Sequence, residues 1–300
     1  MQASTEKLSS QDSIYARLRS DRAEDRVAAL QRLNKQPRLA RQAMSPLLAL
    51  LADDRQVERT RYVGAGFHDV GTVSPAMMAA ELLARLGRWS VIPLRLRLQD
   101  SNPVVRRYAV RALGLMVNPE HAGWLLQSLT DSDVAVSMEA YTALQKQDPQ
   151  VYVKLIKQRD LNDMLVQQSQ LHIQLLGQSR HGDALPVLFR LASASNPVLR
   201  RASFAALANF AEASLESIVL QGLRDSDLQV RESALLLTPQ HRSPEVLAAV
   251  LAQLSVDDVN VQQTAYRLLP ELTGASQRPM EDWQEWRKGQ LHIPSPSTPN

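Results

Sequence analysis

One pattern of about fifteen residues recurs along most of this chain at a regular spacing. One copy reads Asp100-Ser-Asn-Pro-Val-Val-Arg-Arg-Tyr-Ala-Val-Arg-Ala-Leu-Gly114. Five copies have a small residue at their centre: Ala109, Ala140, Ser203, Ala234 and Ala265. The successive spacings are 31, 63, 31 and 31 residues, and a degenerate copy at 164–177 fills the double interval. Repeats of this length bury their apolar faces only by stacking on one another, so the spacing predicts a repeat architecture rather than a single compact core.

Each repeat is predicted to consist of two helices. Asn102-Pro103 and Asn196-Pro197 each supply an N-cap followed by proline at the first helical position. The residues after the cap form an apolar stripe at helical spacing: Val105, Ala109, Ala112 and Leu113. A shorter apolar helix precedes each second helix. Glycine at 114 and 177 is expected to end the second helix of its repeat. The sequence therefore predicts an all-α protein, an α-solenoid (alpha-alpha superhelix) of about eight helix pairs over residues 14–272.

The segments outside the repeats differ from them in composition. Residues 1–13 and 292–300 are expected to be disordered, the second because it is rich in proline and serine. Residues 53–74 interrupt an early helix pair and are expected to form a loop, with Asp53 and Asp54 as solvated acids at a helix end. Residues 273–291 predict a capping helix. The residues that would cover the last repeat lie three apart on one face: Met280, Trp283 and Trp286.

The repeat motif identifies a family resemblance. Units in which Asp-x-x-Pro-x-Val-Arg opens the second helix and Ala-Leu-Gly closes it resemble HEAT repeats, and more narrowly the short HEAT-like units of the phycobilisome-lyase type. The resemblance implies a structural ladder, in which an arginine at the start of each second helix pairs with an aspartate of its own or a neighbouring repeat. The ladder residues are then Arg26, Arg106, Arg200 and Arg231 with Asp100, Asp131 and Asp225.

No catalytic constellation is present in the sequence. The chain has no cysteine, which excludes thiol catalysis and Cys-ligated metals. Its six histidines show no His-Glu-x-x-His spacing, and there is no His-Glu dipeptide of the kind that holds iron in HEAT-like deoxyhypusine hydroxylases. We therefore expect no catalytic residues, no metal site and no cofactor.

The charge is distributed unevenly. Residues 1–111 carry 19 Lys and Arg against 11 Asp and Glu, whereas the rest of the chain carries 15 against 20. This asymmetry favours a protein partner with an acidic surface. Arginines outside the ladder are expected to project from the second helices, which line the concave face: Arg107, Arg111 and Arg201. The insertion adds further candidate contact residues: Arg59, Arg61, Tyr62, Phe67, His68 and Asp69.

The sequence thus favours a non-catalytic scaffold that binds a partner protein, and two alternatives stay open. The first alternative, implied by the resemblance, is a bilin lyase-like protein that acts on a chromophore-bearing partner. The second is nucleic-acid binding, which we consider unlikely because the acidic C-terminal part would repel phosphates. No apolar run is long enough to span a bilayer. Since no signal peptide is visible, a cytoplasmic location is expected, or a periplasmic one if a leader has been removed.

Overall fold

The computed structural model describes residues 12–62, 67–210, 215–274, 276, 279, 282–283 and 285. The chain divides into two compact units, residues 1–152 and 153–300, which are described separately below. Of the segments expected to be disordered, 1–13 and 292–300, only residues 12 and 13 are described, and they are helical.

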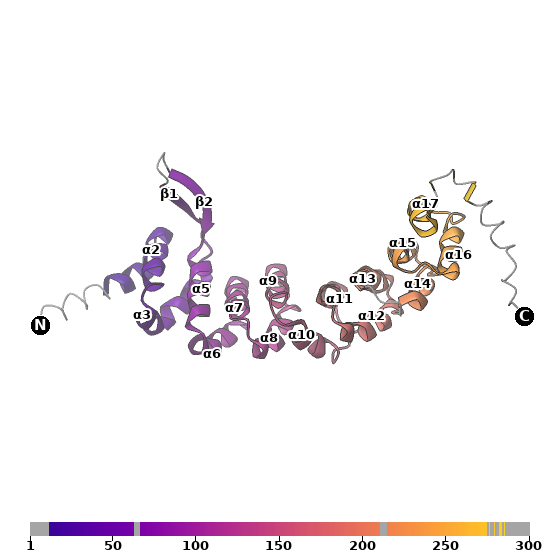
Figure 1. The fold of residues 1–300 in the computed structure, drawn as a ribbon. Coiled ribbons are helices and arrows are strands. Elements are labelled where there is room, and N and C mark those ends of the chain that lie inside the picture. The colour runs from indigo at the N-terminus through magenta and orange to yellow at the C-terminus, as the bar shows by residue number, and fades with distance from the viewer. Residues whose placement is uncertain are drawn as a thin grey trace, which may run out of the picture. The chain divides into compact units, whose positions relative to one another are not determined.

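Unit 1 begins with a helical segment at 12–18 and continues with regular helices and one hairpin. Its elements are α2 (Ala23–Leu33), α3 (Pro37–Gln42), α4 (Met44–Ala49), the 3₁₀ turn η1 (Leu50–Ala52), β1 (Val57–Tyr62), β2 (Phe67–Val73), α5 (Pro75–Leu86), α6 (Arg88–Arg97), α7 (Pro103–Leu115), η2 (Pro119–His121), α8 (Ala122–Ser128) and α9 (Val134–Leu144). The second helices α5, α7 and α9 pack side by side, while α6 and α8 form the adjacent row of first helices (Figure 1).

Unit 2 repeats the same arrangement of helices. Helix α10 (Pro149–Ile156) crosses the boundary in the sequence. It is followed by α11 (Val166–Ser179), η3 (Gly182–Ala184), α12 (Leu185–Ala192), α13 (Pro197–Leu207), α14 (Glu216–Gly222), α15 (Leu228–Leu235), η5 (Thr238–Gln240), α16 (Pro244–Gln253) and α17 (Val259–Thr273). Here α11, α13, α15 and α17 pack in succession as second helices. Within the described residues the chain contains eight helix pairs, which confirms the predicted all-α solenoid.

Polar side chains fix where the second helices begin. Asn102 Oδ1 accepts a hydrogen bond from the Val104 amide at 2.9 Å, and Asn196 Oδ1 accepts one from the Val198 amide at 2.9 Å. Aspartates do the same work at the starts of α9, α15 and α17: Asp133, Asp227 and Asp258. The predicted N-caps are therefore present, and they satisfy amides that have no partner inside the helix.

Small residues at the repeat centres allow the helices to approach closely. The five central residues of the motif have no exposed surface. Gly114 and Gly177 lie inside the last turns of α7 and α11 rather than after them, which corrects the prediction that they end these helices. A Cβ at Gly177 would lie 2.8 Å from the Cα of Ala206, and one at Gly114 would overlap the Cβ of Ala143. These glycines are required by contact with the next second helix, not by a turn.

The insertion at 53–74 is not a loop, and that prediction was wrong. Strands β1 and β2 pair antiparallel, with Val57 opposite Val73 at the base and Tyr62 opposite Phe67 at the far end. The physical reason is the content of β-branched and aromatic residues, Val57, Thr60 and Tyr62, the last two of which alternate with Arg59 and Arg61. In Figure 1 the hairpin projects beyond the end of α5.

No helix among the described residues is both long enough and apolar enough to cross a membrane. They also contain no cluster of three or more His, Asp or Glu side chains arranged to hold a metal ion.

Candidate functional site

Asp53 connects the hairpin to helix α2. Asp53 follows η1 and lies four residues before the start of β1, and its carboxylate is mostly buried. Its Oδ2 lies 2.7 Å from Nε of Arg26, and its Oδ1 lies 2.7 Å from Nε of Arg55. Arg26 is itself buried and also donates to the Ser20 carbonyl at 2.6 Å. The first strand is therefore held at its start by two guanidinium groups.

Asp54 connects the hairpin to helix α7. Arg107 Nη2 lies 2.5 Å from Asp54 Oδ2, and the Tyr108 hydroxyl donates to Asp54 Oδ1. The Tyr108 oxygen lies 3.2 Å from Oγ of Ser74, which follows β2 and caps α5 by accepting from the Met77 amide. One side chain of α7 thus contacts the residues that precede β1 and follow β2. We call Asp53, Asp54, Arg26, Arg107 and Tyr108 the hairpin brace.

The pKa values of the two adjacent carboxyl groups of the brace, Asp53 and Asp54, shift in opposite directions. Burial raises the pKa of Asp53, and the charge of Arg26 only partly offsets it. Burial also acts to raise the pKa of Asp54, but hydrogen bonds from Tyr108 and Arg107 outweigh it and lower the pKa. Burial and the bond to Asp54 raise the pKa of Tyr108, so this hydroxyl stays a donor.

Opposite pKa shifts in neighbouring carboxyl groups are typical of a general acid and base. Here, however, all four carboxylate oxygens of Asp53 and Asp54 already contact an arginine or the tyrosine. The arrangement therefore suits mechanical bracing better than catalysis. The expectation that Asp53 and Asp54 are solvated acids at a helix end was wrong.

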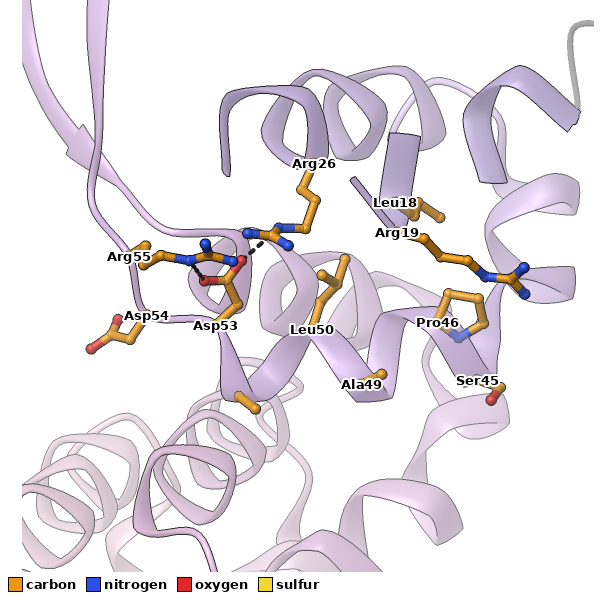
Figure 2. Close-up of a pocket in the computed structure, with 11 residues that line it drawn as sticks. Leu18, Arg19, Arg26, Ser45, Pro46, Ala49, Leu50, Asp53, Asp54 and Arg55 are labelled. Atoms are coloured by element: carbon orange, nitrogen blue, oxygen red, sulfur yellow. Dashed lines mark hydrogen bonds and ion pairs between the residues drawn. The ribbon is translucent and has the colours of Figure 1, made fainter. Parts of the chain in front are cut away.

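A pocket of about 940 Å³ lies beside the brace. One wall is apolar and is formed by Leu18, Pro46, Ala49 and Leu50. Figure 2 shows Arg26 and Arg55 converging on Asp53 at one end of the pocket, with Arg19 at the other end near Pro46. The pocket thus combines an apolar surface with the positive charges of two exposed arginines, Arg19 and Arg55.

The ladder arginines contact aspartates as follows. Arg106 binds the Asp131 carboxylate through Nε and Nη2, both at 2.8 Å, and also donates to the Asp100 carbonyl at 2.8 Å. Arg200 binds Asp225 in the same bidentate way, at 2.8 and 2.7 Å. In both cases the carboxylate belongs to the next repeat.

The remaining ladder residues depart from this pairing. Arg231 donates to the backbone carbonyl of Asp225 at 2.5 Å rather than to a carboxylate. The Asp100 carboxylate lies 3.4 Å from Arg97 and accepts from the Asn102 amide. Arg26 takes Asp53 of the brace as its acid. Sequence comparison of the repeats missed Asp53, although it lies 27 residues after Arg26, close to the 25 that separate the other two pairs.

The three arginines predicted to project from second helices all have intramolecular partners. Arg107 belongs to the brace, and Arg111 lies 3.6 Å from Glu139 on the neighbouring helix α9. Arg201, on α13 of unit 2, donates to the side-chain oxygen of Gln229. The structure therefore brings Arg107 to the hairpin and leaves Arg111 beside it on α7, one turn along.

The predicted insertion residues lie in the two strands. Arg59, Arg61 and Tyr62 belong to β1, and Phe67, His68 and Asp69 belong to β2. The register pairs Arg61 with His68 and Thr60 with Asp69, which places this group in the half of the hairpin remote from its base. Of the predicted C-terminal cap, Trp283 is fully buried, whereas Met280 and Trp286 lie outside the described residues.

The comparisons with known proteins agree with the repeat pattern. Residues 91–171 match a family model of HEAT repeats. This segment of the chain is similar to HEAT repeats. It contains the whole of α7, α8, α9 and α10, with two copies of the motif and the Arg106–Asp131 pair. No curated protein sequence matches the chain.

Several solved structures are similar to this chain at low identity. The E. coli protein YibA is 16% identical, with 84% of this chain and 95% of that chain covered and a TM-score of 0.44. Human deoxyhypusine hydroxylase is 16% identical over 91% of this chain and 99% of its own, with a TM-score of 0.34. The CpcE–CpcF complex of phycocyanin lyase from Nostoc sp. is 17% identical over 85% and 94%, with a TM-score of 0.34.

Proposed function

We propose that this protein is a non-catalytic HEAT-repeat scaffold that binds a partner protein through the 53–74 hairpin and the adjoining second helices. The observation that supports this proposal is the brace, which holds a projecting hairpin on two different helices. A segment held in one orientation loses less conformational entropy when it binds. The brace thus prepares the hairpin for recognition.

The hairpin has the features of an incomplete sheet. Within the described residues β1 and β2 pair only with each other, so each strand has one edge without a strand partner. An isolated two-stranded hairpin is at best marginally stable in water, and a free strand edge can accept another strand. Addition of a strand from a partner would supply the missing main-chain hydrogen bonds. The hairpin is therefore the part of this scaffold best suited to an extended peptide.

The types of residue in the hairpin favour an acidic partner. Arg59 and Arg61 recur with period two in β1, and Tyr62 and Phe67 face each other in the register at its far end. Arginine and aromatic residues are enriched at the energetic centres of protein interfaces. Arginine also binds carboxylates through two parallel hydrogen bonds.

Arginines on second helices of each unit offer additional contacts. In unit 1, Arg111 is partly exposed, and its distance of 3.6 Å from Glu139 leaves it able to exchange that acid for one of a partner. In unit 2, Arg201 on α13 is a separate candidate contact, because its partner Gln229 is neutral and leaves its charge available. Arg107 is committed to Asp54, so its main contribution is to hold the hairpin in place.

The test is affinity capture from native lysate with a matched set of variants. We expect the wild type to retain a partner that is lost when residues 57–73 are replaced by a short Gly-Ser linker, and weakened by Arg59→Glu with Arg61→Glu. Arg242→Glu is the control, because Arg242 is exposed and lies outside the hairpin. The proposal is wrong if the captured proteins are the same for all four chains while every variant remains folded.

A further inference from the structure

Helix α6 exposes an apolar stripe to solvent. Trp89, Ile92 and Leu96 are 48%, 71% and 71% exposed. They are spaced i, i+3 and i+7, so they share one face of the helix, while Ser90 and Leu94 on the other face are buried against the repeats. A single exposed apolar residue is ordinary, but three on consecutive turns of one helix form a patch of the kind that marks an interaction site.

Arginines surround this stripe. The guanidinium groups of Arg41 and Arg88 lie 4.4 and 5.1 Å from the centre of the Trp89 ring. Arg95 stacks in the same way, 5.0 Å from the ring of Trp124 on α8. Helix α6 contains no acidic residue. The patch is therefore apolar along its centre and positively charged along its borders.

These arginines are oriented but electrostatically unpaired. In the part of the chain that the structure describes, Arg41, Arg88 and Arg95 form no ion pair. Stacking on an aromatic ring covers one face of a guanidinium and leaves its N–H groups, which lie in the plane of the guanidinium, pointing outward. Carboxylates accept such N–H groups in pairs. The surface is thus prepared for acids that lie on both sides of an apolar stripe.

We propose that the α6 face docks an acidic amphipathic helix of a partner protein. Such a helix would place apolar residues at i, i+3 or i+4, and i+7 against Trp89, Ile92 and Leu96, with Asp or Glu on its flanks. This surface belongs to the row of first helices and lies on the opposite side of unit 1 from the hairpin (Figure 1). The proposal therefore does not depend on hairpin binding.

The charge of the chain favours a partner over its own segments or a second copy. Residues 1–11 contain one acid, Glu6, and residues 286–300 contain none, so neither terminal segment offers an acidic stripe. Two α6 faces would bring like charges together.

The test uses a labelled synthetic helix with leucine along one face and glutamate on the other, titrated by fluorescence anisotropy against the full chain. We expect saturable binding that weakens about tenfold or more with Ile92→Ser and Leu96→Ser together. Arg41→Gln with Arg88→Gln should weaken binding and reduce its dependence on salt. Val259→Ser is the matched control, because Val259 is 65% exposed on α17, outside this face, and it should change nothing.

Several results would overturn the proposal. One is the absence of binding, or binding of equal affinity by a control peptide. The control peptides are one of the same composition with its leucines scattered around the helix and one with lysine in place of glutamate. Another is affinity unchanged by the Ile92 and Leu96 variants. A third is sedimentation of the protein with phosphatidylcholine–phosphatidylserine vesicles that the same variants abolish, which would assign the face to a membrane. A dimer that these variants dissociate would assign it to a second copy.

Discussion

Replacing Gly114 with alanine should destabilise unit 1, although alanine is the better helix former. The new Cβ would overlap the Cβ of Ala143 and lie 3.2 Å from its Cα. Carbon atoms pack at about 3.5–4.0 Å, so helices α7 and α9 must separate. Overpacking of this kind costs about 1–3 kcal/mol. Alanine's helix propensity returns up to about 1 kcal/mol, so the net loss is about 0–2 kcal/mol.

Gly123→Ala separates these two effects. Gly123 lies in α8, and a Cβ there would meet no atom within 4 Å. This variant therefore keeps the gain in helix propensity without the overlap. Urea unfolding followed by far-UV circular dichroism should place Gly114→Ala about 1–3 kcal/mol below Gly123→Ala. If the two variants are equally stable, α7 and α9 do not pack as closely as described.

Three further predictions concern single polar groups. Arg106→Ala should destabilise the fold by about 2–3 kcal/mol in urea unfolding, because it leaves the mostly buried Asp131 without its bidentate partner. The control Arg242→Ala, at an exposed arginine, should change stability by at most about 0.5 kcal/mol. Equal effects of the two substitutions would refute the ladder's role. Burial lowers the pKa of His172 from 6.5 to about 4, assisted by the charge of Arg159 and opposed by the hydrogen bond to the Gln168 carbonyl. On acidification the unfolded chain therefore binds a proton at His172 before the folded protein does, so the free energy of unfolding falls as the pH drops from 6.5 to about 4. His172→Gln should flatten this decline, which amounts to about 3 kcal/mol, and an unchanged pH profile would contradict the assignment. Asp54→Asn should speed hydrogen exchange across β1 and β2 with little change in the melting temperature, and unaltered exchange would show that the brace does not order the hairpin.

The repeat architecture could be predicted because its signals are local and occur several times. An Asn-Pro or Asp cap, a small central residue and an apolar stripe appear together in each copy, and each reinforces the assignment of the others. The buried centre of the repeat at Ala109, Ala140 and Ala265 follows directly from that agreement. The bidentate Arg106–Asp131 geometry resides in the same motif.

The hairpin and its brace were missed because each depends on a single, non-repeated segment. The alternation from Arg59 to Tyr62 was visible, but it lies within a helical protein and was interpreted as a loop rich in arginine. The contact of Arg107 with Asp54 joins residues 53 apart, and no local pattern specifies such a pair. Because of this contact, Arg107→Glu would place two acids together and should loosen the hairpin.

The exposed stripe on α6 illustrates the same limit. Trp89, Ile92 and Leu96 have the spacing of a buried helix face, and only the structure shows that Ser90 and Leu94 occupy the buried side instead. Periodicity reports which residues share a face, but not which of two apolar faces the fold covers.

The central claim is that the braced hairpin is the surface this scaffold presents to a partner. Hydrogen–deuterium exchange of the full chain, with and without the captured partner, tests it directly. Main-chain amides of β1 and β2 should exchange much more slowly in the complex, because a strand or surface laid against the hairpin protects its free edges. Protection confined to other helices, with residues 57–62 and 67–73 exchanging at the same rate in both states, would contradict it.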